Sequence, residues 1–390
     1  MVRRPSWISI FVGGALALLA AVVILYLYAV REQVHRYYET ELVPERLQPA
    51  AGPPPPPAFR LTDVSWIQSD LELPFSLSFE MLAAQQGRDE SRQKIDFLMG
   101  TTWGATAIPR QIGFIPGQDP EVGFRHAASA LGFVRHYLVT NDAERYVREL
   151  KAQLSNGRAV RVAVDLVKLE KRPLEEPTLH SIVLVGYDET SFEYYEPVCR
   201  PHAPAPCEPG THAPGLKGLT VPTKQLLDAV DQMSLVFKYP WNYQLLVLEK
   251  GAPTSEGYSM ALRRNGRALV GFKRDDFSSG AEAIDETAKD VSKAKREGFS
   301  KALERGVRLA TLVRRDDARI LSVLFPGDPR AEIAATHLEH AAEAYAKAVA
   351  TFVDGKSDVF GLNDALVAAA SADRSAGEAL LLPEPDAGSH

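Results

Sequence analysis

The sequence contains very little cysteine. Its 390 residues include only Cys199 and Cys207, which excludes a small disulfide-stapled fold, an iron–sulfur ferredoxin and a four-cysteine zinc site. An excess of one charge sign is also missing, because 44 basic residues stand against 50 acidic ones, and no basic surface for nucleic acid is indicated. At this length and with 45% hydrophobic residues, the chain is expected to form two or three structural units.

One long hydrophobic run is present near the N-terminus. The 24 residues from Trp7 to Val30 carry no charge, and a helix of that length exceeds the ~30 Å hydrocarbon core of a bilayer. The apolar part of a signal peptide is shorter, about 7 to 15 residues. We therefore predict a single-pass anchor and juxtamembrane helix over residues 1–47. The N-terminus is expected to be cytoplasmic and the bulk extracytoplasmic, in the periplasm or outside a bacterial cell.

A run of prolines follows the anchor. Pro53 to Pro57 are consecutive, and such a run favours polyproline II, which is semi-rigid and offers no backbone donors to a sheet. We predict that residues 48–60 form a linker that holds a domain away from the membrane. Recognition by a proline-binding module is the alternative.

Residues 61–253 alternate between helical and strand patterns. Residues 78–87 and 142–155 have helical patterns that end at glycine or Asn-Gly. Residues 159–167, 180–188, 191–197 and 243–250 are short runs rich in valine, isoleucine or aromatic residues, which favour buried strands. The expected fold class is α+β, with an antiparallel sheet packed on helices.

Four fragments of this region occur in the order seen in one known family. They are QSDLELPFSLSFEM from Gln68, IGFIPGQDPEVGFRHAASALGF, NGRAVRVAVD and LHSIVLVGYDETSFEYYEP. Together they resemble the papain-like, bacteriocin-processing (double-glycine leader) cysteine peptidases, over about half of the chain. The resemblance implies a papain-like peptidase-type domain over residues 61–253.

The resemblance also implies a site and shows where it is degenerate. A papain-type site needs a thiolate nucleophile, a histidine base, a residue that orients the histidine, and a glutamine at the oxyanion. His180 matches the histidine, Glu196 stands where the family has aspartate, and Gln68 matches the glutamine. The nucleophile position falls on Pro74, which has no nucleophilic group and no backbone N–H, and Phe75 replaces the next glycine. We therefore expect a pseudoenzyme.

Two serines close to Pro74 offer an alternative. Ser76 and Ser78 lie near the predicted start of a helix, where serine usually accepts a backbone N–H as a cap. With Phe75 they would line the former cleft as binding residues. The alternative is an active hydrolase or acyltransferase in which one of these serines attacks and His180 is the base.

The two cysteines lie in one proline-rich loop after His180. Cys199, His202, Cys207 and His212 have gaps of two, four and four residues, which resemble those of a zinc knuckle. An extracytoplasmic location favours a disulfide between Cys199 and Cys207, and this is our prediction. Zinc and free thiols are the alternatives. No metal site and no cofactor are predicted elsewhere, because the pair His337 and His340 lies among solvated glutamates.

The C-terminal part, residues 254–380, is predicted to be mainly helical. Asn265-Gly266 indicates a β-hairpin turn, and helices are expected over 281–306, 307–325, 331–353 and about 359–370. The long helix should begin at Asp328-Pro329 and end at Gly355. Residues 381–390 are expected to be a disordered tail.

These features predict a membrane-anchored protein that acts by binding. It would recognise a peptide segment, or act as a structural or assembly subunit of a membrane complex. Since the resembled family cleaves after small paired residues, the resemblance implies a glycine-rich or extended peptide as ligand. The expected partners are the lipid bilayer and a peptide or protein, and nucleic acid is not among them.

Overall fold

The structure is a computed structural model of the whole chain. It describes residues 7–48, 53–107, 115–116, 119–171, 177–199, 208–252, 256–273, 278–293, 301–353 and 356–383. Helices and strands are mixed along the sequence, so the predicted α+β class is confirmed.

The largest sheet brings distant parts of the chain together. Its order is β1-β6-β12-β7-β8-β9-β11, and β2 pairs with β8. Neighbouring strands are antiparallel except for β1 and β6. All four strands predicted within residues 159–250 belong to this sheet. The strands are β1 Glu45–Arg46, β2 Phe59–Arg60, β6 Phe133–Thr140, β7 Val160–Asp165, β8 Leu179–Tyr187, β9 Ser191–Tyr195, β11 Leu219–Pro222 and β12 Tyr243–Lys250.

Helices cover both faces of this sheet. On one face α2 and α4 contact β7, where the Arg161 guanidinium lies against the rings of Phe75 and Phe124. On the other face α5 and α7 pack, and Tyr146 of α5 stacks on Tyr243 of β12. The helices are α2 Pro74–Gln85, α3 Arg92–Met99, α4 Pro120–Leu131, α5 Ala143–Ser155, α6 Leu166–Leu169 and α7 Thr223–Phe237.

Local sequence explains where α4 begins and ends. The Asp119 side chain caps its first turn by accepting the Glu121 N–H, and Pro120 stands at the start, where its missing N–H costs nothing. Gly132 ends it with φ of 72°, a left-handed value that glycine adopts without strain. Asp328 and Pro329 begin α11 in the same way, as the sequence predicted.

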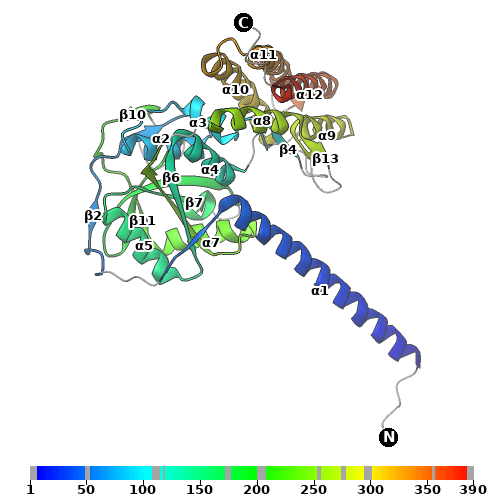
Figure 1. Cartoon of the computed structure of the whole chain (residues 1–390). Coiled ribbons are helices and arrows are strands. Elements are labelled where there is room, and N and C mark those ends of the chain that lie inside the picture. Colours follow the sequence, from blue (N-terminus) through cyan, green and yellow to red (C-terminus); the bar gives the residue numbers. More distant parts are fainter. Residues whose placement is uncertain are drawn as a thin grey trace.

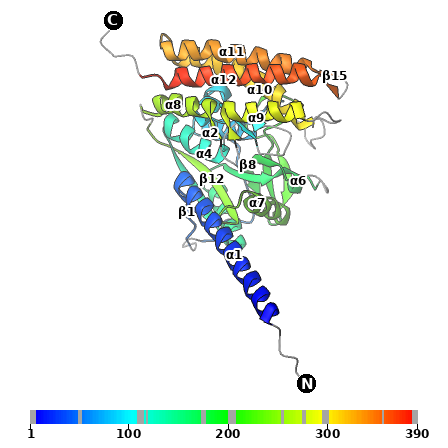
Figure 2. The ribbon, with the colours of Figure 1, turned by 90° about the vertical axis from the view of Figure 1, so that its right-hand side faces the viewer.

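The C-terminal helices form a layer above α2 and α4. Figure 2 shows α11 and α12 outermost, with α8 and α9 beneath them. One buried apolar cluster contains side chains from all four helices α9, α10, α11 and α12. Side chains of α8 and of parts of α10, α11 and α12 also belong to the main core. The helical part is therefore packed onto the α/β part through apolar side chains. The helices are α8 Glu256–Val270, α9 Gly280–Lys293, α10 Lys301–Leu324, α11 Pro329–Ala350 and α12 Val359–Leu381.

Several short strands complete the fold. β10 (Gly210–His212) pairs with β3 (Trp66–Gln68). A second small sheet has the order β13-β14-β4-β5, and a third joins β15 and β16. Their bounds are β4 Ala105–Ala107, β5 Ile115–Pro116, β13 Phe272–Lys273, β14 Ser278–Ser279, β15 Phe352–Val353 and β16 Lys356–Ser357.

The predicted hairpin at Asn265-Gly266 is wrong, because both residues lie inside α8. Asn265 is buried, and its Nδ2 donates to the Phe97 carbonyl over 2.9 Å. A Cβ at Gly266 would lie 2.9 Å from the Gly377 carbonyl oxygen. The glycine therefore permits close contact between α8 and α12 and forms no turn.

Three helix boundaries in this part also differ from the prediction. The division expected between residues 306 and 307 falls inside α10, and α12 continues to Leu381 instead of ending near residue 370. α11 ends at Ala350 and is followed by β15, so the helix stops before the predicted end at Gly355. Residues 384–390 of the predicted tail lie outside the described residues.

α1 (Trp7–Leu42) is a continuous helix of 36 residues that projects from the rest of the molecule (Figure 1). Its last turn is part of the core, where Tyr38 and Leu42 are buried and the Tyr38 ring contacts that of Tyr239 at 4.4 Å. The carbonyls at its C-terminal end accept hydrogen bonds from Arg125 and Arg135. The helix is therefore tied directly to the α/β part.

The proline run does not form the predicted stalk. β1 before the run pairs with β6, and β2 after it pairs with β8, so both flanks belong to the same sheet. α1 already packs against the α/β part at Leu42, eleven residues before the run begins at Pro53. Among the described residues, no helix is long and apolar enough to cross a membrane. The described side chains of α1 begin at Leu19, so the first half of the charge-free run lies outside that statement, and the anchor stays a prediction.

Candidate functional site

His180 and Glu196 form a buried pair, as expected from the sequence. His180 lies near the start of β8, Glu196 directly follows β9, and the pairing of β8 with β9 brings them together. His180 Nε2 lies 2.7 Å from Glu196 Oε1, and the two residues are 3% and 1% exposed. With Glu196 ionised, Nε2 carries the proton of this contact, and Nδ1 is the only ring nitrogen left for a basic role.

Gln68 joins this pair from β3. Its Nε2 donates to the Glu196 backbone carbonyl over 3.2 Å, and Trp66 Nε1 donates to the same oxygen over 2.7 Å. The Trp66 ring also stacks on Tyr195 at 4.9 Å. Trp66 was not singled out from the sequence, although it lies one strand repeat before Gln68 and so points to the same side of β3.

His212 approaches the same group from β10. Its Nε2 lies 3.2 Å from Gln68 Oε1 and 2.9 Å from the Glu208 carbonyl oxygen. The sequence indicated His212 only as a zinc-ligand alternative. The structure instead places it on the glutamine that the resemblance assigns to the oxyanion, so Gln68 has polar partners at both ends of its amide.

Pro74, Ser76 and Ser78 lie at the start of α2. Pro74 is in the first turn, where its missing N–H is tolerated. Ser76 Oγ donates to the Leu73 carbonyl over 3.2 Å, and Ser78 Oγ donates to the Pro74 carbonyl over 2.7 Å. Ser78 also accepts a hydrogen bond from Ser181 Oγ over 2.9 Å. Both hydroxyls therefore form hydrogen bonds with the start of α2 itself, and Ser78 also with the neighbouring strand β8.

Phe75 belongs to a polar cluster that the sequence reasoning missed. Arg161 of β7 is 1% exposed; its Cζ lies 4.4 Å from the centre of the Phe75 ring, and its Nε donates to Ser181 over 2.8 Å. Its Nη1 lies 2.5 Å from the buried Glu121 carboxylate. An arginine inside the valine-rich segment AVRVAVD was the available signal, because a charge in a buried strand needs a partner.

These contacts sort the predicted site residues into two groups. Successive side chains of a strand point to opposite faces, so His180 and Ser181 of β8 are directed to different sides of the sheet. Ser181 binds Ser78 of α2, whereas His180 binds Glu196. The structure thus assembles His180, Glu196 and Gln68, but it groups the candidate serine Ser78 with Ser181.

The cysteine loop is described only in part. Cys199 is buried, and its N–H donates to the Ser69 carbonyl over 2.7 Å. His202 and Cys207 lie outside the described residues, so the predicted disulfide stays a prediction. Within the described part of the chain, no group of three or more histidine, cysteine, aspartate or glutamate side chains could hold a metal ion.

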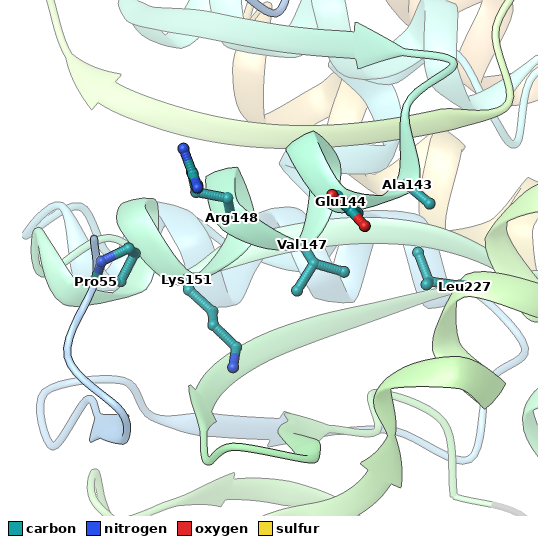
Figure 3. A pocket seen from close by; sticks show the side chains of 7 residues that line it. All are labelled: Pro55, Ala143, Glu144, Val147, Arg148, Lys151 and Leu227. Carbon is teal, nitrogen blue, oxygen red and sulfur yellow. The ribbon is translucent and has the colours of Figure 1, made fainter. Parts of the chain in front are cut away.

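A pocket of about 370 Å³ lies away from this site, between α5 and α7. Val147 and Lys151 of α5, Leu227 of α7 and Pro55 of the proline run border it (Figure 3). None of the predicted site residues is among its lining residues. The pocket and the histidine–glutamate pair are therefore separate features.

The sequence of this chain was compared with protein-family models and with curated proteins. No protein-family model matches it, and no curated protein matches its sequence. The resemblance to papain-like peptidases therefore rests on the four fragments and stays a hypothesis.

Proposed function

We propose that the chain is a membrane-anchored, peptidase-like protein that acts by binding and does not cleave its ligand. It would hold an extended peptide segment, or serve as an assembly subunit of a membrane complex. The observation that carries the proposal is the position of Pro74 in the first turn of α2, where the resemblance requires a nucleophile. A prolyl ring supplies no attacking group.

The state of the serines supports binding over catalysis. A nucleophilic hydroxyl must lie within hydrogen-bond reach of its base. Ser76 and Ser78 instead donate to the Leu73 and Pro74 carbonyls, and strand alternation directs His180 away from the face that holds Ser78. Ser76 also shares a hydrogen bond with the buried Asp96 carboxyl, and among the described contacts neither serine reaches His180, the base that the serine hydrolase alternative requires.

The exposed part of α1 supports the membrane anchor. Its apolar side chains between Leu19 and Tyr28 are 47% to 68% exposed, and they point to all sides of the helix. An apolar surface that surrounds a helix suits lipid, because a protein partner would cover only one face. These side chains are Leu19, Val22, Val23, Ile24, Leu25, Tyr26, Leu27 and Tyr28.

Purification of the intact chain from bacterial membranes in a mild detergent tests this proposal. We expect the protein to resist extraction by alkaline carbonate. We expect a protein partner to co-purify equally with the wild type and with His180→Gln, in which the amide can still donate to the buried Glu196 carboxylate but cannot act as a base. A double substitution Ile24→Arg/Leu27→Arg should release the chain from the membrane. Carbonate extraction of the wild type would contradict the anchor. A partner that is cleaved by the wild type and left intact by His180→Gln would contradict the binding role.

A further inference from the structure

The edge of β3 beside the candidate site is covered by a segment of the chain itself. β10 pairs with β3 in antiparallel register, with Gly210 opposite Gln68 and His212 opposite Trp66. On its other side β3 continues into Ser69, whose N–H donates to the Pro197 carbonyl over 3.0 Å. The strand that carries Gln68 therefore lies between the segment after Glu196 and β10.

β10 has few ties besides this pairing. It is three residues long, β3 is its only strand neighbour in the described part of the chain, and Gly210 and Thr211 are exposed. Pro209 and Pro214 stand on either side of it. Proline cannot donate a ladder hydrogen bond, so these two residues limit how far the pairing can extend. The described side-chain contacts of β10 come from His212, which meets Gln68 and lies edge-on to the Trp66 ring.

This arrangement has the form of peptide recognition by strand addition. In that mode an extended peptide gains affinity from main-chain hydrogen bonds to a sheet edge, and side chains of the receptor give specificity. Here the main chain of β10 pairs with the edge of β3, while the His212 ring contacts the side-chain oxygen of Gln68. A second strand in the same place would recover the same backbone hydrogen bonds, so exchange would cost little enthalpy.

We propose that the edge of β3 is a binding site for an extended peptide strand, and that β10 occupies this site as a built-in, displaceable occupant. The tethered strand competes with any external peptide at an effective concentration on the order of millimolar. The intact chain therefore binds only peptides that outcompete β10, and weakening β10 opens the site. This inference deepens the proposed function, because it names how the peptide would be held and what keeps the site closed.

A peptide copied from the chain tests the site without knowledge of its natural ligand. The probe is a fluorescently labelled peptide with the sequence of residues 208–214, EPGTHAP, and its binding is followed by anisotropy with the full chain in mild detergent. In the opened variant Thr211→Pro/His212→Pro, two adjacent residues lose their N–H groups, and one of these two groups faces β3. We expect the opened variant to bind the probe at least about tenfold more tightly than the wild type does.

The controls separate a strand site from non-specific binding. A probe in which proline replaces the threonine and the histidine should not bind either protein. A folded opened variant, judged by an unchanged circular dichroism spectrum, that binds the probe no better than the wild type would overturn the inference. That result would leave the co-purification test of the proposed function unaffected, since the test does not depend on β10.

Amide hydrogen exchange of the wild type provides a second test that needs no variant. If β10 is displaceable, the amides of residues 210–212 that are bonded to β3 exchange through local opening, far faster than those of the central strands β8 and β12. Protection of β10 equal to that of β8 would overturn the inference even if the opened variant failed to fold.

Discussion

Among single residues, Glu196 makes the contacts on which the candidate site depends. Its carboxylate binds His180 Nε2 and accepts the Val198 N–H over 3.0 Å, while its carbonyl accepts from Trp66 and Gln68. The resemblance predicted the pairing of Glu196 with His180. The support from Trp66 could not be predicted, because it depends on how β3 lies against the end of β9.

Glu196→Ala should lower the free energy of unfolding by about 3 kcal/mol. The change leaves the buried His180 ring and the Val198 N–H without their acceptor, and breaking a buried pair in this way is strongly destabilising. Glu196→Gln keeps an acceptor oxygen and should cost only about 1 kcal/mol. Chemical denaturation measures both, with the exposed Glu189→Ala as a control expected to stay within about 0.5 kcal/mol. Equal values for Glu189→Ala and Glu196→Ala would contradict this account of the pair.

The buried carboxyl group of Asp317 should make the free energy of unfolding depend on pH. It is 2% exposed and accepts the Thr102 hydroxyl over 2.9 Å. Burial raises the pKa of Asp317 from 3.8 to about 7, although the Arg314 guanidinium opposes the shift. Between about pH 4 and 7 the folded state therefore keeps a proton that the unfolded chain has released. Stability from this group is complete below pH 4 and is lost as pH rises toward 7.

Asp317→Asn removes this titration. We expect the melting temperature of the wild type to fall between pH 5 and pH 8 more steeply than that of the variant, when both are followed by circular dichroism in the same buffer series. Asp364→Asn, at an exposed position of α12, is the control, and it should keep the wild-type slope. Parallel curves for the wild type and Asp317→Asn would show that Asp317 does not hold the proton.

At the scale of elements, sequence patterns predicted structure where the deciding contacts are local. The strands at β7, β8, β9 and β12 follow from their apolar runs, and α11 follows from its cap at Asp328 and Pro329. The pattern failed at Asn265-Gly266, because a distant glycine, Gly377, decides the structure there. No local rule distinguishes a turn glycine from one that lets two helices meet.

Gly377→Ala should destabilise the packing of α12 on α8. A Cβ at this position would lie 2.7 Å from the Gly266 carbonyl oxygen and 2.8 Å from Val270 Cγ2, too close without a backbone shift. Overpacking of this kind typically costs about 1–3 kcal/mol. Thermal unfolding should show this loss for Gly377→Ala and none for Ser371→Ala, which changes an exposed position of the same helix. A Gly377→Ala variant with the thermal stability of the wild type would contradict this account, because α8 and α12 would then move apart without cost.

At the scale of the whole molecule, α1 and the α/β part are joined without a flexible connector. The sequence predicted the helix but assigned the connection to the prolines, because the burial of Tyr38 and Leu42 depends on partners far along the chain. The residues from Arg31 to Leu42 span about 18 Å of helix. If α1 enters a bilayer as we propose, this helical segment sets the distance of the candidate site from the membrane and its orientation relative to the membrane.

Arg125 and Arg135 should maintain this joint. Both donate to carbonyls at the C-terminal end of α1, where positive charge also favours the helix dipole. Arg125→Ala/Arg135→Ala should increase amide exchange over residues 36–43 by about tenfold or more, since lost caps cost roughly 1–2 kcal/mol. Arg148→Ala on the exposed side of α5 should leave these amides unchanged. Unchanged exchange in the double variant would place the joint elsewhere.

Covalent labelling of the intact chain with a serine-reactive fluorophosphonate tests the central claim, which is that this protein binds without catalysis. The reagent is applied to the wild type and to His180→Gln in mild detergent, and the adducts are mapped by mass spectrometry. The account predicts no labelling of Ser76 or Ser78 in either protein, because Pro74 supplies no nucleophile and both hydroxyls are bonded to helix carbonyls. An adduct on either serine that disappears in His180→Gln would contradict it.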